Sequence, residues 1–158
     1  MSATNPENGT VSYTYNGYNK VATRTDAKGQ KVAYSYDGYA RLTKVQRYPT
    51  VNGAEDTCQQ ENYSYDSNPF DGSYSQNVVG RLAAVQYMGG YVPGPYGNPC
   101  DTTFTEMYSY SGAGAVTGKR LRVTRGSGVD LNATFNYDNE GRMTSEQYPQ
   151  SGPNLGMG

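Results

Sequence analysis

Aromatic and polar residues alternate along short stretches of this chain. Tyr13 and Tyr15 occupy every second position, with Ser12 and Thr14 on either side of Tyr13. In a β-strand, successive side chains point to opposite faces, so the tyrosines share one face and the small polar groups share the other. The pattern predicts a strand, and the same alternation recurs further along the chain.

The alternation belongs to a repeated tetrad: an aromatic residue, a small polar residue, an aromatic ring that is always tyrosine, and a polar residue. The copies are 13–16, 34–37, 63–66, 108–111 and 135–138. Each is followed by a basic and an aliphatic residue: Lys20-Val21, Arg41-Leu42, Arg81-Leu82, Arg120-Leu121 and Arg142-Met143. Recurrence in register indicates a repeat architecture in which each unit packs on its neighbours.

The segment between the last tetrad residue and the basic residue is predicted to be a turn. In three copies it is short, because the basic residue follows Asn16, Asp37 or Asp138 by four positions. Asn and Asp bond their own backbone two residues on, and Gly141 can adopt the positive φ of a tight turn. Ala40 occupies the corresponding place in the second copy, which predicts either another turn form or local strain.

Two copies are longer at this place. Fifteen positions separate Asp66 from Arg81, and nine separate Ser111 from Arg120. Insertions at one place in a repeat indicate a loop at the rim of the sheet. A second alternating stretch follows each basic residue, so each repeat is predicted to be one hairpin.

The predicted fold is therefore all-β, an array of antiparallel β-hairpins that forms one twisted, curved sheet. The expected hairpins span 11–31, 32–60, 61–103, 104–132 and 133–150, followed by a Gly- and Pro-rich tail at 151–158. We expect one such array rather than several domains, since the chain has only 158 residues.

Composition fits strands and turns. Hydrophobic residues make up 35% of the chain, while tyrosine occurs 17 times and glycine 20 times, so phenol rings must supply much of the core. The net charge of −1 gives no attraction for nucleic acid, which needs clustered basic residues. No stretch approaches the roughly 20 apolar residues that cross a bilayer, so no membrane insertion is expected.

The two cysteines, Cys58 and Cys100, lie in polar loop segments rather than in apolar runs. If they pair, the disulfide closes a loop of about 42 residues and contributes roughly 4 kcal/mol in the chain-entropy model. A disulfide would indicate an oxidising compartment. The alternative, two free thiols in a cytosolic protein, stays open because two cysteines are weak evidence of compartment.

The sequences Tyr36-Asp37 with Arg41-Leu42, and 137–142, resemble the YD repeat of the RHS family. The similarity extends from about Val11 to Tyr148. The family comprises RHS toxins, shell-forming components of insecticidal toxin complexes and teneurins. Their YD repeats form a long spiralling β-sheet that wraps into a hollow shell or barrel. The resemblance implies a secreted or cell-surface location. The self-cleavage element and toxin of polymorphic members have no counterpart here, so the chain resembles a part of the repeat region.

The resemblance and the turn chemistry together assign structural roles to the motif residues. These are Tyr15, Tyr36, Asp37, Arg41, Tyr65, Asp66, Arg81, Tyr110, Arg120, Tyr137, Asp138 and Arg142. No enzyme is expected, because the chain has no histidine and the regular aspartates belong to turns. No cofactor or metal is expected either. Zinc would need clustered His or Cys ligands, although a calcium site in the loop at 66–77 stays a minor alternative.

The predicted function is structural: a building block of an extracellular fibre, or a wall segment of a larger YD-repeat shell. Its partners would be copies of itself or further repeats of a longer chain, joined through edge strands. The alternative is a glycan-binding module, because exposed tyrosine rings on a sheet can stack against sugars. Exposed rings in a row would favour the module, and rings buried between repeats would exclude it.

Overall fold

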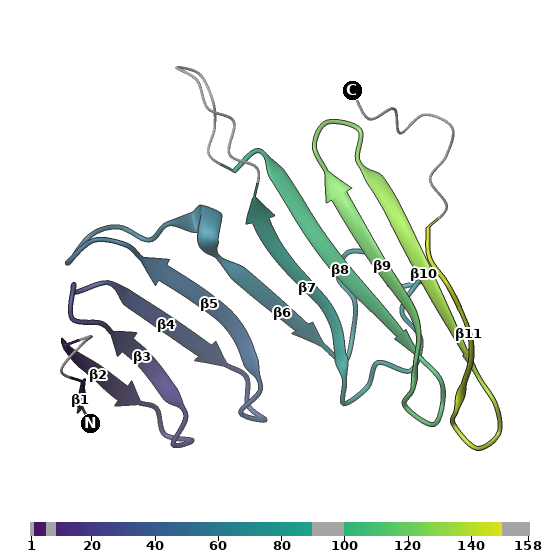
Figure 1. Ribbon diagram of the computed structural model, residues 1–158, viewed down its shortest axis with the longest axis horizontal. Coiled ribbons are helices and arrows are strands. Elements are labelled where there is room, and N and C mark those ends of the chain that lie inside the picture. Colours follow the sequence, from purple (N-terminus) through teal and green to yellow (C-terminus); the bar gives the residue numbers. More distant parts are fainter. Residues whose placement is uncertain (1, 6–8, 90–99, 150–158) are drawn as a thin grey trace. The chain divides into compact units, whose positions relative to one another are not determined.

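The computed structural model describes residues 2–5, 9–89 and 100–149 (Figure 1). These residues form eleven strands and one short 3-10 helix, η1 (Thr57–Gln59). The strands are β1 (Ser2–Asn5), β2 (Gly9–Tyr15), β3 (Val21–Thr25), β4 (Lys31–Tyr36), β5 (Leu42–Tyr48), β6 (Glu61–Tyr65), β7 (Leu82–Gly89), β8 (Thr102–Tyr110), β9 (Val116–Thr124), β10 (Val129–Tyr137) and β11 (Met143–Gln147). The predicted all-β class is confirmed.

Hydrogen bonds join the strands into a sheet in chain order, from β1 to β11. The residues fall into two compact units. Unit 1 comprises Met1–Tyr63 and Gln86–Thr103, and unit 2 comprises Ser64–Val85 and Phe104–Gly158. Each unit is described by itself below. Consecutive strands pair as antiparallel hairpins, such as β2 with β3 and β4 with β5 in unit 1.

The second tyrosine of the tetrad lies where each hairpin meets its turn. In unit 1 the antiparallel register shifts between Ser35 and Tyr36, so that Tyr36 pairs with Leu42. The same shift precedes Tyr15 in β2 and Tyr137 in β10. A bulge adds one residue to one strand and increases the local twist. The repeat therefore fixes an irregularity at the same point of each of these hairpins.

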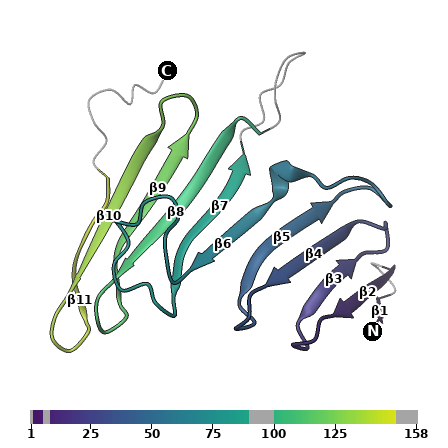
Figure 2. The same ribbon diagram turned by 180° about the vertical axis from the view of Figure 1, so that it is seen from behind.

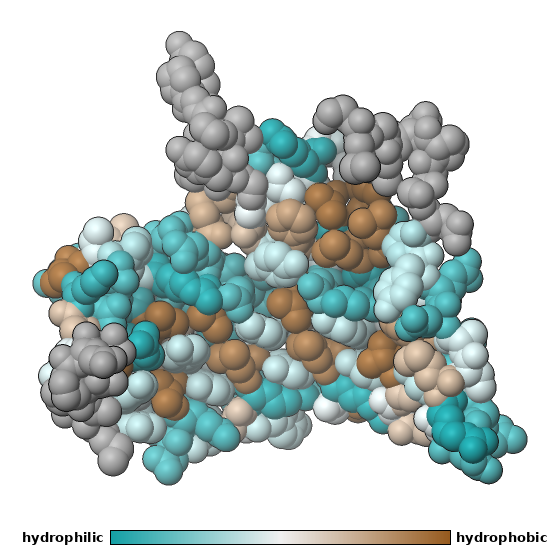
Figure 3. Space-filling model, in the orientation of Figure 1, coloured by the Kyte–Doolittle hydropathy of each residue, from teal (hydrophilic) through white to brown (hydrophobic). Residues whose placement is uncertain are grey.

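Few side chains are fully buried, as expected for a sheet rich in tyrosine and small residues. In unit 1, Val45 on β5 is buried. In unit 2, Ala83 and Ala84 on β7 and Met107 on β8 have no exposed surface. On the face drawn in Figure 3, apolar side chains gather in separate patches among hydrophilic ones. No helix within the described ranges is long and apolar enough to cross a membrane.

One sequence expectation is wrong, and one strand was not predicted. The stretch from Ser111 to Arg120 is not an expanded loop: the chain turns at 111–115 and then forms β9, which contains Arg120. The turn closes without a basic residue, so the basic-aliphatic pair did not mark its end. Residues 2–5 form a strand, β1, which pairs with β2 although no motif predicts it. The predicted tail at 151–158 lies outside the described residues.

Ala40 adopts a φ of 59° in the turn between β4 and β5. This is the left-handed region, which costs a residue with a Cβ roughly 1–2 kcal/mol relative to glycine. Gly141 occupies the equivalent place before β11, with a φ of 80° and open space around its missing Cβ. The strained alternative for Ala40 is therefore the one that the structure adopts.

We predict that Ala40→Gly raises the free energy of unfolding by about 1 kcal/mol, because glycine removes this strain. Gly141→Ala, the matched reverse change, is expected to lower it by a similar amount. Chemical denaturation of both variants measures the effect. A loss of stability in Ala40→Gly would contradict the assigned turn geometry.

Candidate functional site

The best-defined feature of the motif is the turn built around Asp37 in unit 1. Its Oδ1 accepts hydrogen bonds from the backbone N–H groups of Tyr39 and Arg41, both at 2.9 Å. The backbone closes the turn as well, because the N–H of Asp37 donates to the Arg41 carbonyl and the N–H of Ala40 donates to the Asp37 carbonyl. One carboxylate thus satisfies two turn amides that no strand can pair.

The same turn recurs at other positions. Asp138 in unit 2 accepts from the N–H groups of Glu140 and Arg142, and Asn16 in unit 1 accepts from those of Tyr18 and Lys20. The turn at 111–115 keeps the backbone bonds and uses the Ser111 hydroxyl as acceptor. The motif therefore encodes a five-residue turn, and its acceptor is Asp, Asn or Ser.

A further copy of this turn joins β3 to β4, at 26–29, where Asp and Gly are turn-forming residues. Asp26 Oδ1 accepts from the N–H groups of Lys28 and Gln30. Gly29 has the positive φ, like Ala40. No tetrad precedes this turn, and its sequence signal is the aspartate three positions before a glycine.

Arginine strengthens the turn in two copies. The Nε of Arg41 donates to Asp37 Oδ2 at 2.7 Å, and Arg142 makes the same bond to Asp138. Partial burial tends to raise the pKa of Asp37, but hydrogen bonds from Arg41 and Tyr39 outweigh this and hold the pKa below its ordinary value. The pKa of Asp138 is also lowered, first by the hydrogen bond from the Arg142 side chain.

In three copies, the tyrosine at the third position of the tetrad links its hairpin to the one before it. Tyr36 donates its hydroxyl to the carbonyl of Val21, the first residue of β3, at 2.9 Å. Tyr137 donates in the same way to Val116, the first residue of β9. In unit 2, Tyr110 donates to Leu82 at the start of β7. The tyrosine hydroxyl is therefore a specific bond between successive hairpins.

Two other predicted tyrosines end their strands. Tyr15 is the last residue of β2, pairs with Val21 and is 45% exposed, and Tyr65 is the last residue of β6. Arg81 lies at the base of the long insertion in unit 2, where its backbone carbonyl accepts from the Asp66 N–H. Asp66 Oδ1 accepts from Gly80, so Asp66 and Arg81 still meet across the inserted residues.

Residues 67–80 form an ordered loop of unit 2 that crosses the strands β8 and β9 (Figure 2). The backbone of Gln76 bonds β8 twice, by donating to Ser109 Oγ and by accepting from the N–H of Tyr110. Asn68 is buried and bonds Ser75 within the loop. The insertion is therefore a packed element of unit 2.

Asp71 fastens the middle of this loop to β9. Its Oδ2 accepts from Arg120 at 2.7 Å and from Arg122 at 3.4 Å. Asp130 on β10 accepts from Arg122 at 2.7 Å, so two carboxylates share the two arginines. The Ser73 hydroxyl lowers the pKa of Asp71 most, and the N–H of Tyr74 and the two guanidinium groups lower it further. Arg120 thus serves the loop rather than the turn at 111–115.

Tyr74 fills the space between the loop and β9. The guanidinium of Arg120 lies 4.1 Å from the centre of its ring. A Cβ at Gly118 would lie 3.0 Å from its hydroxyl, so any larger residue there would require the phenol to shift. The hydroxyl itself is buried, and the described residues offer it no hydrogen-bond partner. Burial raises the pKa of Tyr74, which keeps the ring neutral.

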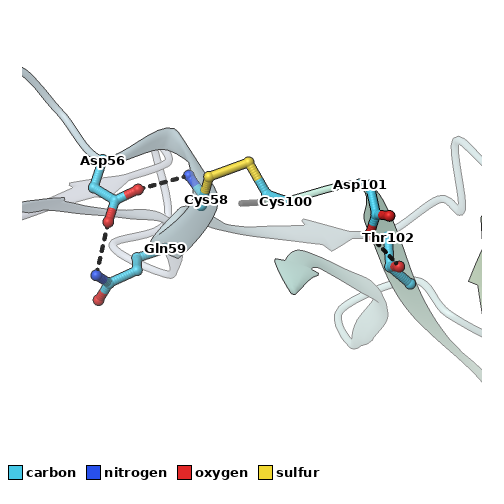
Figure 4. Close-up of a disulfide and its surroundings, with 6 residues drawn as sticks. All are labelled: Asp56, Cys58, Gln59, Cys100, Asp101 and Thr102. Atoms are coloured by element: carbon cyan, nitrogen blue, oxygen red, sulfur yellow. Dashed lines mark hydrogen bonds between the residues drawn. A yellow bond between two sulfur atoms is a disulfide. The ribbon is translucent and has the colours of Figure 1, made fainter. Parts of the chain in front are cut away.

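Cys58 and Cys100 form a disulfide in unit 1, so of the two alternatives left open by the sequence the structure adopts the paired one (Figure 4). Their Cα atoms are 5.2 Å apart, within the usual range for a bridge. Asp56 caps η1 beside it by accepting from the Cys58 N–H. The bond ties the segment before β6 to the residue two positions before β8, across a sequence separation of 42.

The oxygen ligands considered for calcium do not converge. Asp66, Asn68 and Asp71 each accept backbone N–H groups of the loop, and the Asn77 amide donates to the Tyr110 carbonyl. No group of three or more His, Cys, Asp or Glu side chains that could hold a metal occurs among the described residues. The geometry of these side chains serves the loop itself.

Comparison with known proteins rests on structure alone. No family model matches the chain. No curated protein sequence matches it either. A chain in the crystal structure of TcdB2-TccC3-TEV superposes with a TM-score of 0.65 at 12% identity, and the match covers 94% of this chain. This likeness shows a shared fold.

The structural neighbours are chains of Tc toxin assemblies. A chain in a structure of the Photorhabdus luminescens Tc holotoxin pore also matches, at 15% identity over 88% of this chain, but its TM-score of 0.25 carries no argument. This chain spans 7% of the length of its TcdB2-TccC3-TEV neighbour.

We predict that Asp71→Asn makes the loop at 67–80 more susceptible to chymotrypsin, which cleaves after Phe70 and Tyr74. The neutral amide loses its ion pairs with Arg120 and Arg122, so the loop opens more often. The cleavage rate should rise severalfold with little change in the global unfolding midpoint.

The matched control is Asp130→Asn, which removes a carboxylate from the same arginines without touching the loop. Equal cleavage of both variants would contradict the anchoring role of Asp71.

Lowering the pH gives a second test of the anchoring by Asp71. Because the folded-state pKa of Asp71 is lowered, anchoring is complete above the ordinary value of 3.8 and is lost as the pH falls through the lowered value.

Proposed function

We propose that this chain is a structural building block made of YD-type hairpins, which forms part of a shell wall or a fibre outside the cell. The observation that carries the proposal is the repeated bond from the tetrad tyrosine to the preceding hairpin, as from Tyr36 to Val21. Such a bond joins units in series and does not depend on a ligand. The fold shared with a Tc toxin-assembly chain supports the same conclusion.

The polar groups of the motif support a structural role rather than catalysis, and we propose that the chain is not an enzyme. The carboxylates of Asp37 and Asp138 accept hydrogen bonds from their own turns and from Arg41 and Arg142. A general acid or base needs a pKa near the working pH, whereas the pKa of both aspartates is lowered from an already acidic value.

The strand β11 offers a surface for assembly. It is the last strand in the hydrogen-bonded order, and each of its residues from Met143 to Gln147 is exposed. An edge strand presents unpaired backbone groups that can pair with another chain. The partner is proposed to be a copy of this chain or a further hairpin of the same kind, and open head-to-tail pairing would give a filament.

The disulfide supports a secreted or cell-surface location. A bond between Cys58 and Cys100 persists in oxidising surroundings and is reduced in most cytosols. In the chain-entropy model, closing a loop of this length contributes roughly 4 kcal/mol to stability. Secretion is therefore consistent with how unit 1 is held together.

We predict that the purified chain assembles in a concentration-dependent way, measured by light scattering and by electron microscopy. Thr144→Lys with Gln147→Lys should reduce assembly at least severalfold, because lysines on an edge strand oppose pairing. The control Thr124→Lys with Ser127→Lys adds the same two charges at exposed positions at the turn between β9 and β10 and should assemble like the wild type.

A single monomeric species at all concentrations would contradict the proposed assembly. Equal loss of assembly in the edge and control variants would show that charge alone, rather than the β11 edge, is responsible. Filaments in the micrographs would favour the fibre, and closed or short assemblies would favour the wall segment.

A further inference from the structure

Two tyrosines project from the turns of unit 1. Tyr18, between β2 and β3, is 54% exposed, and Tyr39, between β4 and β5, is 81% exposed. Both hold the third position of the five-residue turn. A single exposed aromatic residue is ordinary. The same residue at the same place in successive hairpins is not explained by chance exposure, and the two turns lie at the same end of their strands (Figure 1).

The turn itself does not require an aromatic side chain at this position. Unit 2 has Ala113 and Glu140 there, in turns that close with the same backbone hydrogen bonds. In all four turns the residue is exposed. The phenol rings of Tyr18 and Tyr39 therefore add apolar surface that the fold does not use.

The ring of Tyr39 is partly pre-organised. The guanidinium of Arg41 lies 5.0 Å from its centre, and Asp37 holds that arginine by a bond of 2.7 Å. The glycine before each ring leaves open space, because a Cβ at Gly17 or Gly38 would meet nothing within 4 Å. A ligand can thus approach the rings without displacing a neighbouring side chain at these glycines.

The strand order sets the spacing of the two turns that carry the rings. Since β3 pairs with β4, the two turn tips lie two strand spacings apart, roughly 10 Å. A polyproline II helix has three residues per turn and rises about 3.1 Å per residue, so it repeats after roughly 9 Å. Turns at this spacing match successive turns of such a helix.

The polar chemistry of the rim is rich in donors. Tyr18 and Tyr39 carry hydroxyl groups, and the ammonium of Lys20 is exposed. The side-chain acceptors Asn16 Oδ1 and Asp37 Oδ1 already accept two turn N–H groups each. Proline-rich segments have carbonyl groups without intramolecular partners and few N–H groups, so they suit aromatic rings flanked by donors.

We propose that the rim formed by Tyr18 and Tyr39 binds a proline-rich peptide in the polyproline II conformation. A glycan chain would use the same rings, but its hydroxyl donors would compete for the side-chain oxygens of Asn16 and Asp37, which already accept hydrogen bonds within their turns. A nucleic acid would need a basic groove, which a chain of net charge −1 does not favour. The proposal does not depend on assembly through β11.

The test is calorimetric titration of the full chain with an acetylated, amidated decaproline peptide. Tyr18→Ala and Tyr39→Ala should each weaken binding roughly fivefold, and the double variant more than tenfold, through loss of stacked rings. Triproline is roughly 9 Å long and reaches one ring, so it should bind more than tenfold more weakly than decaproline. Tyr148→Ala removes a tyrosine that is 60% exposed elsewhere and should leave binding unchanged.

Ala113 shows that alanine fits this turn position, so the variants should fold, and their unfolding midpoints should match the wild type. The proposal is overturned if decaproline does not bind, if the double variant binds as tightly as the wild type, or if Tyr148→Ala loses binding equally. Tighter binding of cellohexaose than of decaproline, lost in the double variant, would also overturn it and assign the rim to glycans.

Discussion

The fold depends on one side-chain interaction, in which a single oxygen accepts the backbone N–H groups two and four residues further along the chain. It recurs with nearly constant geometry at Asn16, Asp26, Asp37 and Asp138. These N–H groups lie where the chain reverses direction, so no neighbouring strand offers a carbonyl to accept their hydrogen bonds. The acceptor side chain therefore fixes where each strand ends, and the strand register follows from it.

The tyrosine hydroxyl extends this local order from one hairpin to the next. Because the turn and its bulge fix the end of β4, Tyr36 reaches the first carbonyl of β3 rather than a group in its own hairpin. Side chains that are fully buried are few, so polar bonds of this kind carry much of the specificity that a large apolar core would provide elsewhere. The insertion in unit 2 uses the same principle, with Asp71 and Arg120.

The sequence predicted features whose cause is local, and missed those that depend on packing. The turns at Asp37 and Asp138 followed from their own five residues. The role of Arg120 did not, because its partner Asp71 lies 49 positions away in an insertion whose path no local pattern indicates. The turn at Asp26 is equally local: no tetrad precedes it, and an acceptor followed three positions later by a left-handed residue suffices. The sequence shows tyrosines at positions 18 and 39, but it does not predict that their rings are exposed at the rim.

The central claim is that the acceptor side chain holds the turn amides, and amide hydrogen exchange followed by nuclear magnetic resonance tests it most directly. The N–H groups of Arg41 and Arg142 should exchange as slowly as those of the adjoining strands, although both lie at turns. Their protection should fall selectively when Asp37 or Asp138 is replaced by alanine. Exchange at the rate of an unstructured peptide in the wild type would contradict the account.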